Sequence, residues 1–154
     1  MTAVPISIAD LIELGTFGPI AIGSTRHAVG AIFGEPTDAT ITNRRQTSCV
    51  WRYGEVEFHF DDDLLSLIHC DADDLFEGGP TLAIHPWKLR LRMPLLEVKA
   101  ILDAKAIYYT GCDDCHEPDC LLKLNSGCTL GFVLDSDAGF GPTGLRSWSI
   151  IRGG

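Results

Sequence analysis

Residues 50–70 read VWRYGEVEFHFDDDLLSLIHC, and this stretch decides the fold that we expect. Within it Val56, Phe58 and Phe60 alternate with polar residues, so one face of an extended chain would be apolar and the other polar. A period of two is typical of a half-buried strand in an antiparallel sheet. A further apolar run lies on each side, separated by a glycine and by an acidic turn. The stretch therefore predicts a three-stranded antiparallel meander.

Two helices are expected before this meander. The first runs from Ser7, which can cap its start, to Gly15, which can adopt the left-handed conformation that ends a helix. The second begins at Ser24, its candidate cap, and ends before Pro36. Gly30 inside the second helix lowers helix stability relative to alanine, so we expect close packing against a neighbour there.

The order of helix and then meander occurs twice along the chain. Val29 of the second helix matches Val98 of a later helix (98 − 29 = 69), and Phe58 matches Phe132 (132 − 58 = 74). The additional residues fit into the loop over 106–119. A repeat of this length indicates one supersecondary unit used twice. Chance similarity between two amphipathic helices and two hairpins is the alternative.

We therefore expect an α+β fold made of two tandem helix-plus-antiparallel-meander units, with the helices packed on one face of the sheet. Residues 1–154 would form a single domain, with a first repeat over 17–70, an acidic linker over 71–86 and a second repeat over 87–152. Pairing the two units would give a larger core than either could build alone.

Several short motifs in the first unit resemble a known family. They are Phe33-Gly34-Glu35-Pro36 at the end of the helix, Trp51-Arg52-Tyr53-Gly54 at the first strand, and the alternating residues that follow. This pattern resembles the repeat unit of the β-lactamase inhibitor protein family, and it is similar to small outer-membrane lipoproteins of the barrel-assembly machinery. The second unit lacks both motifs. The resemblance implies two tandem repeats and a concave sheet that binds another protein.

The charge of the chain points to the kind of partner. Asp and Glu together number 21 against 12 Lys and Arg, which gives a formal net charge of −9. Such a surface repels phosphate backbones, so nucleic acid is not an expected partner. It attracts a basic protein over long range, although acidic loops can also serve solubility alone.

The sequence contains no run of about 18 apolar residues, so a membrane partner is not expected. Its start lacks the basic segment and apolar run of a secretory signal. Six cysteines without such a signal favour a reducing compartment, and we expect a cytoplasmic protein.

The sharpest cluster of chemically reactive residues is formed by Cys112, Cys115, His116 and Cys120. Thiolates and an imidazole at this spacing could hold a tetrahedral Zn²⁺ that staples the loop, so zinc is possible although no cofactor is required. Free thiols and a disulfide are the alternatives. A redox role is disfavoured because the surrounding acidic residues oppose thiolate formation.

We assign no catalytic residue and expect a protein that is not an enzyme. The sequence has neither a Gly-x-Ser-x-Gly elbow nor a glycine-rich phosphate loop followed by lysine. One alternative is an enzyme of unfamiliar type that uses His59 with Glu55 and Glu57. That alternative requires these side chains to converge in a pocket.

The expected function is protein binding by an inhibitor or immunity-type protein that neutralises a basic bacterial toxin or enzyme. A zinc-stapled structural or regulatory module is the alternative. The expected contact residues are acidic loop residues and the aromatic residues near them, because aromatic side chains anchor many interfaces. They are Asp61, Asp62, Asp63, Asp73, Asp74, Phe76, Glu77, Tyr109 and Phe140.

Overall fold

The computed structural model describes residues 2–71, 77–111, 120–134 and 142–151. These residues form a mixed α+β fold with helices α1 (Ile8–Leu14), α2 (Arg26–Phe33) and α3 (Leu95–Ala104) and a short 3-10 helix, η1 (Gly79–Thr81). The strands are β1 (Val4–Ser7), β2 (Asp38–Ile41), β3 (Cys49–Tyr53), β4 (Val56–Asp61), β5 (Leu64–Asp71), β6 (Leu82–His85), β7 (Tyr109–Gly111), β8 (Cys120–Leu124), β9 (Cys128–Leu134) and β10 (Pro142–Ile151). Among the described residues, no helix is long and apolar enough to cross a membrane.

Eight strands form one antiparallel sheet in the order β2-β3-β4-β5-β10-β9-β8-β7. The predicted meander is confirmed as β3, β4 and β5, and its alternation follows the expected faces, since Val56, Phe58 and Phe60 are buried. The centre of the sheet is the pairing of β5 with β10, in which Ile68 lies opposite Ile150. Strands far apart in the chain therefore meet at the middle of the sheet.

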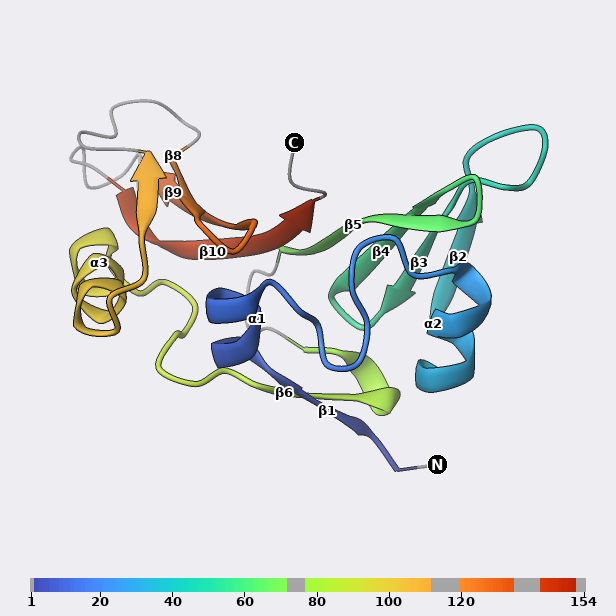
Figure 1. Cartoon of the computed structure of the whole chain (residues 1–154), viewed down its shortest axis with the longest axis horizontal. Helices are drawn as coiled ribbons and strands as arrows, with labels where there is room; N and C mark the ends of the chain where they lie inside the picture. The colour runs from blue at the N-terminus through green and yellow to red at the C-terminus, as the bar shows by residue number, and fades with distance from the viewer. Residues whose placement is uncertain (1, 72–76, 112–119, 135–141, 152–154) are drawn as a thin grey trace.

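The helices lie on one side of this sheet, as predicted, and none of the described helices covers the other side (Figure 1). The pair β1–β6 lies on the helix side as well and forms a second, parallel sheet of two strands. We refer to the side of the eight-stranded sheet without helices as the open face.

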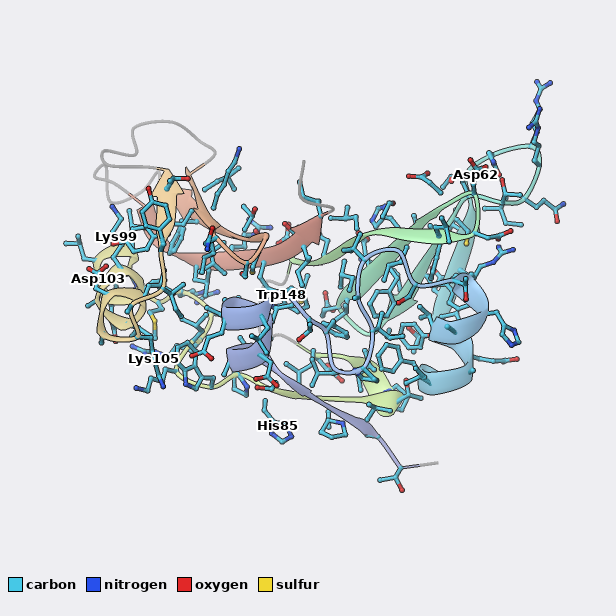
Figure 2. The ribbon with its side chains drawn as sticks, in the orientation of Figure 1. Asp62, His85, Lys99, Asp103, Lys105 and Trp148 are labelled. Carbon is cyan, nitrogen blue, oxygen red and sulfur yellow. The ribbon has the colours of Figure 1, made fainter. Side chains whose placement is uncertain are left out.

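Aromatic rings between the sheet and the helices join the two halves of the core. The ring of Phe17 packs edge-on against Phe58 at 5.4 Å between centroids and lies 5.7 Å from the ring of Trp148 on β10. Phe33 of α2 stacks on Phe58 at 5.8 Å. All four side chains are buried, and Figure 2 shows Trp148 near the middle of the molecule. One core thus contacts both halves of the sheet.

The predicted ends of α1 are confirmed. The Ser7 hydroxyl accepts a hydrogen bond from the Asp10 amide at 3.2 Å, and Gly15 ends the helix in the left-handed conformation. The predicted cap of α2 is wrong by one residue, because Thr25 accepts from the Ala28 amide. Ser24 instead accepts from the Ala21 amide in the preceding turn.

Gly30 of α2 packs against the sheet, as its position inside a helix predicted. A Cβ atom at Gly30 would lie 3.5 Å from the Trp51 ring, which is ordinary contact distance. An alanine would therefore fit at Gly30 without displacing the Trp51 ring, so the packing against β3 does not require glycine there.

The structure corrects several expected loops. Within the predicted acidic linker over 71–86, residues 79–81 form η1 and residues 82–85 form β6, which pairs with β1. A polar stretch after α2 contains the unpredicted β2, and the expected insertion over 106–119 contains β7. These strands are only three or four residues long, and their partners are not visible from the local sequence.

Candidate functional site

A row of polar side chains crosses the open face from one edge of the sheet to the other. The row arises because strand residues alternate between faces, and the register aligns one residue from each strand. None of its members is buried. In strand order they are Asp38, Arg52, Glu57, His69, Ser149, Thr129, Lys123 and Thr110.

The open face has a hollow of about 350 Å³ over the strands that adjoin its centre. Its walls are charged or polar side chains from β3, β4, β5, β10 and the turn after β3: Arg52, Glu55, Glu57, His69, Asp71 and Arg146. Arg146 reaches the open face at an irregularity in β10, where the pairing with β9 shifts between Leu145 and Ser147. Such bulges commonly redirect a side chain.

Ion pairs organise the charged groups of the hollow. Arg52 lies 3.3 Å from Glu57, which also contacts the His59 ring at 3.2 Å. On the other side, Arg146 Nε donates to Asp71 at 3.0 Å. These pairs are partly exposed, so each contributes at most about 1 kcal/mol and can be exchanged for a partner's charges at low cost.

The residues that line the hollow carry both signs of charge. Counting its two arginines and three carboxylates gives a charge of 2 − 3 = −1 with His69 neutral. Glu57, His69 and Ser149 are adjacent in register, yet within the described structure His69 makes no hydrogen bond to Ser149.

The side chains named for an unfamiliar enzyme converge only in part. Glu55 and Glu57 line the hollow together with His69, and His59 contacts Glu57 from the side. The partial convergence places two carboxylates and two imidazoles on one face. It gives the open face groups that can pair with a basic or a hydrogen-bonding surface.

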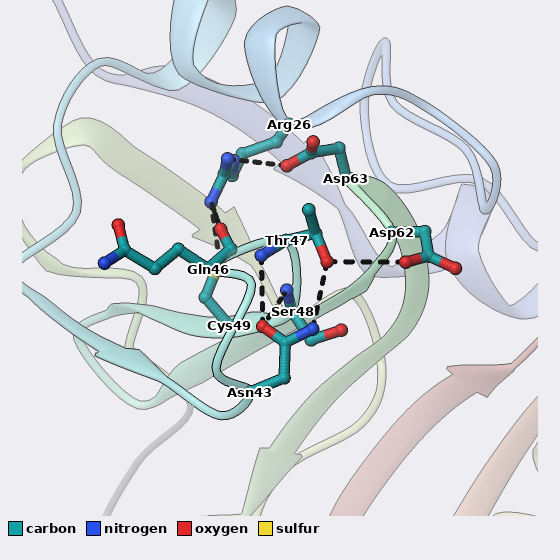
Figure 3. A network of polar contacts seen from close by, with 8 residues as sticks. All are labelled: Arg26, Asn43, Gln46, Thr47, Ser48, Cys49, Asp62 and Asp63. Carbon is teal, nitrogen blue, oxygen red and sulfur yellow. Dashed lines mark hydrogen bonds and ion pairs between the residues drawn. The ribbon is translucent and has the colours of Figure 1, made fainter.

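The acidic turn Asp61-Asp62-Asp63 lies between β4 and β5, where Asp62 and Asp63 adopt the left-handed conformations of a tight hairpin. Figure 3 shows that two of these carboxylates are already used within the chain. Asp63 forms an ion pair with Arg26 of α2 at 2.6 Å, and Asp62 accepts from the Thr47 hydroxyl. A basic partner would therefore compete with internal contacts at this turn.

The loop over 42–48 joins this network through Asn43. The side-chain oxygen of Asn43 (Oδ1) accepts hydrogen bonds from the backbone amides of Thr47 and Ser48. The side-chain nitrogen of Asn43 (Nδ2) donates to the Thr47 hydroxyl at 2.9 Å. The Arg26 guanidinium also donates to the Gln46 carbonyl. The network ties the acidic turn, the loop and the start of α2 together.

The other expected contact residues are spread over the molecule. Glu77 is exposed and its carbonyl accepts from the Glu55 amide at 2.7 Å, next to the hollow. Tyr109 begins β7 and packs partly against the core. Asp73, Asp74, Phe76 and Phe140 lie outside the described residues.

The proposed zinc cluster also falls largely outside the described part of the chain. Cys112, Cys115 and His116 are not described, and Cys120 is described only as the first residue of β8. Among the described residues, no group of three or more His, Cys, Asp or Glu could hold a metal ion. The zinc prediction therefore stays a prediction.

The described thiols are buried inside the fold. Cys49, Cys70 and Cys128 are free thiols that face the core. Burial raises the pKa of Cys128 to about 12, against a smaller opposite effect of a hydrogen bond from the Ser149 backbone. Burial, assisted by the charges of Glu55, Asp71 and Glu57, also raises the pKa of Cys70. Such thiols are unreactive near neutral pH.

Sequence reasoning identified part of the hollow. The alternation of β4 predicted that Glu57 and His59 face away from the core. Arg52, His69, Asp71 and Arg146 were missed as site residues, because their proximity depends on the pairing of β3, β4, β5 and β10. The alternation of β5 could have indicated the face of His69.

Comparison of the chain with protein-family models, with curated proteins and with solved structures found no match.

Proposed function

We propose that this is a non-enzymatic protein that binds another protein through the open face. The partner that we infer is basic, and the function is that of an inhibitor or immunity-type protein that neutralises a bacterial toxin or enzyme. The observation that carries the proposal is the row of polar side chains across all eight strands, none of them buried, with a charged hollow beside its centre.

The dimensions of the open face are those of a protein interface. Eight strands spaced by about 4.8 Å span about 34 Å, and a strand of six residues adds about 20 Å in the other direction. The product, about 700 Å², approaches the roughly 800 Å² that each partner contributes to a standard interface. A small ligand would need only the hollow, so the width of the row favours a macromolecule.

Charge favours a basic protein among macromolecular partners. The net charge of −9 repels nucleic acid and accelerates encounter with a positively charged surface. Exposed ion pairs such as Arg146–Asp71 can be exchanged for contacts across an interface. The resemblance of the first unit to the β-lactamase inhibitor protein family agrees with this proposal.

We also propose that the sheet consists of two copies of one unit. The strand order is consistent with this, since β2-β3-β4-β5 continues into β10-β9-β8-β7 and each set follows a helix. Val29 of α2 and Val98 of α3 are both fully buried, as equivalent positions should be. Superposition of residues 24–71 on 93–151 in an experimental structure tests this, and helices at unrelated angles to their strands would contradict it.

A charge-reversal pair tests the proposed binding. The immobilised protein is used to capture and identify basic proteins at low salt, and each candidate is then titrated by calorimetry. Glu55→Lys should weaken binding at least about tenfold, because Glu55 lines the hollow. Glu13→Lys makes the same charge change at an exposed position of α1, on the helix side, and should have little effect.

Salt provides the second readout. Raising the ionic strength from about 0.05 to 0.5 M should slow association of the wild type more than it changes dissociation. Equal effects of the Glu55→Lys and Glu13→Lys variants would show that the open face is not the binding surface.

A further inference from the structure

The outer edge of β2 is the feature that the proposed function leaves unused. β2 ends the strand order, and all four of its residues are exposed. A strand at a sheet edge offers unpaired amides and carbonyls to another chain, and proteins usually block such edges with proline, bulges or inward charges. Within β2 the sequence Asp38-Ala39-Thr40-Ile41 has neither a proline nor a bulge.

The pairing of β2 with β3 determines which backbone groups face outward. The Thr42 amide donates to the Ser48 carbonyl at 2.9 Å, so Thr42 faces β3. Hydrogen-bonded positions alternate along an antiparallel pair, so Thr40 also faces β3, while the backbones of Ala39 and Ile41 face outward. These two residues provide the groups that an added strand would use.

An apolar hollow lies next to this edge on the helix side. It has a volume of about 530 Å³ and is lined by residues of α2, β2, β3 and the segment that joins α2 to β2: Gly30, Gly34, Glu35, Pro36, Ala39 and Trp51. Figure 1 shows α2 at the same end of the sheet as β2. Ile41, whose pairing partner Cys49 is buried, shares this face, yet its side chain is 56% exposed.

We propose that the occupant of this edge is β2 of a second copy of the chain, paired antiparallel about Thr40. Centring the two strands on Thr40 places Ala39 of each copy opposite Ile41 of the other. This register uses the outward amide and carbonyl of both residues. It also places each Ile41 side chain beside Ala39 of the other copy, at the apolar hollow. The two copies are then related by a two-fold axis at Thr40.

Charge complementarity supports a second copy over an unrelated chain. Asp38 begins β2 and Glu35 lies three residues before it, and Arg44 and Arg45 lie in the turn after its end. None of the four makes an ion pair with a described residue. In an antiparallel pair the acidic end of each copy lies next to the basic end of the other, which brings Glu35 of one copy and Arg45 of the other to the same end of the paired strands.

The experiment is a concentration series by analytical ultracentrifugation at about 0.15 M salt, where the repulsion between two chains of net charge −9 is screened beyond about 8 Å. The weight-average mass of the wild type should rise with concentration toward twice the chain mass of 16.8 kDa. Ile41→Lys should raise the dimer dissociation constant at least about tenfold. Leu14→Lys, at an exposed position of α1, is the matched control and should leave it unchanged.

Two further variants test the register. Ala39→Pro removes an outward amide without removing a bond to β3, and should weaken the dimer as much as Ile41→Lys. Glu35→Arg and Arg45→Glu should each weaken association, and the double variant should restore it. Circular dichroism of each variant shows whether the fold is retained.

Cross-linking provides a direct readout of the two-fold axis. Thr40→Cys places two thiols at a non-hydrogen-bonded pair, where Cα atoms approach to about 4.5 Å, within disulfide range. Oxidation should give a 40–40 disulfide detectable by peptide mass spectrometry, whereas Thr42→Cys on the same strand edge should give none. A monomer at every concentration up to about 1 mM overturns the proposal, even if β2 pairs with a different protein. A dimer that Ala39→Pro and Ile41→Lys both leave unchanged overturns it as well.

Discussion

The hydroxyl of Tyr53 connects β3 to the end of α2. It donates a hydrogen bond of 2.7 Å to the Gly34 carbonyl, and the ring packs against Phe33 and Phe58. The side chain is fully buried, and burial raises the pKa of Tyr53 to about 12. Tyr53 belongs to the Trp51-Arg52-Tyr53-Gly54 motif on which the resemblance rests, and its role there is structural, since a partner cannot reach the buried side chain.

Replacing Tyr53 by phenylalanine should destabilise the protein by about 1–3 kcal/mol, because the Gly34 carbonyl loses its buried donor. Tyr108→Phe is the matched control: Tyr108 is 69% exposed, and its loss of a hydroxyl should cost less than about 0.5 kcal/mol. Urea unfolding followed by circular dichroism measures both. Equal effects would mean that the Tyr53 hydroxyl does not stabilise the fold.

Buried thiols give the protein a second residue-scale property, a loss of stability at high pH. The pKa of Cys128 is raised from 9 to about 12, and that of Cys70 is raised as well. Between pH 9 and about pH 12 the Cys128 thiol stays protonated in the native state, whereas the same thiol loses its proton in the unfolded state. The free energy of unfolding is therefore unaffected below pH 9 and should fall as the pH rises above it.

The expected decline above pH 9 is about 1.4 kcal/mol per pH unit for each fully buried thiol. Urea midpoints at pH 7, 8, 9 and 10 measure it, and Cys128→Ala should reduce the slope while lowering stability at pH 7. A stability that is constant from pH 8 to 10 in the wild type would contradict the burial of these thiols.

At the scale of elements, the end of α1 contacts the turn between β8 and β9. Gly15 has φ of 72°, and a Cβ atom there would collide with the backbone carbonyl of Ser126. Helix α1, from the start of the chain, is thus fitted to a hairpin of the second half. Only glycine satisfies both the backbone conformation and the contact.

We expect Gly15→Ala to cost more than about 2 kcal/mol, because backbone strain adds to the collision with Ser126. Gly23→Ala is a matched control, since Gly23 also has positive φ, 97°, but a Cβ atom there meets nothing within 4 Å. Its cost should be about 1–2 kcal/mol from strain alone. Denaturant midpoints compare the two variants, and equal costs would exclude a tight fit between α1 and the turn.

Elements with a strong local signal were predictable from the sequence. The caps of α1 and the alternation of β4 depend on neighbouring residues, and both are confirmed. The strands β1, β2, β6 and β7 were not predicted. β1, near the start of the chain, pairs with β6, which lies within the predicted linker. β2 is short and exposed at every position, so periodicity carries little information about either strand.

At the scale of the whole molecule, the shared core should make unfolding a single cooperative event. Phe17, Phe58 and Trp148 link the first half of the chain to β10. Removing either half would leave these rings exposed. A domain with one core usually unfolds in an all-or-none transition.

Hydrogen exchange monitored by mass spectrometry tests this in one inner strand from each half of the sheet. Amides of β4 and β9 should open with the same free energy, and Trp148→Leu should lower both equally. Protection that is lost first from one half only would contradict a shared core.

The candidate site was only partly predictable because it depends on strand pairing between distant parts of the chain. Glu57 and His59 follow from local alternation, but the hollow also needs Arg146, which reaches it through pairing of β10 with β5 and a shift in register against β9. Those are properties of contacts between residues far apart in the chain. A single sequence carries no direct signal for them.

The pairing of β5 with β10 has a consequence for synthesis of the protein. Asp71 pairs with Ser147 (147 − 71 = 76 residues later), so a ribosome adding about 5–20 residues per second leaves β5 without its neighbour for about 4–15 seconds. During that interval the nascent chain displays the bare edge of β5, the strand that carries Leu65 and Ile68 of the folded core. Neighbouring nascent chains on the same messenger RNA would display the same edge, so this protein should depend on ribosome-associated chaperones more than one whose sheet grows in chain order.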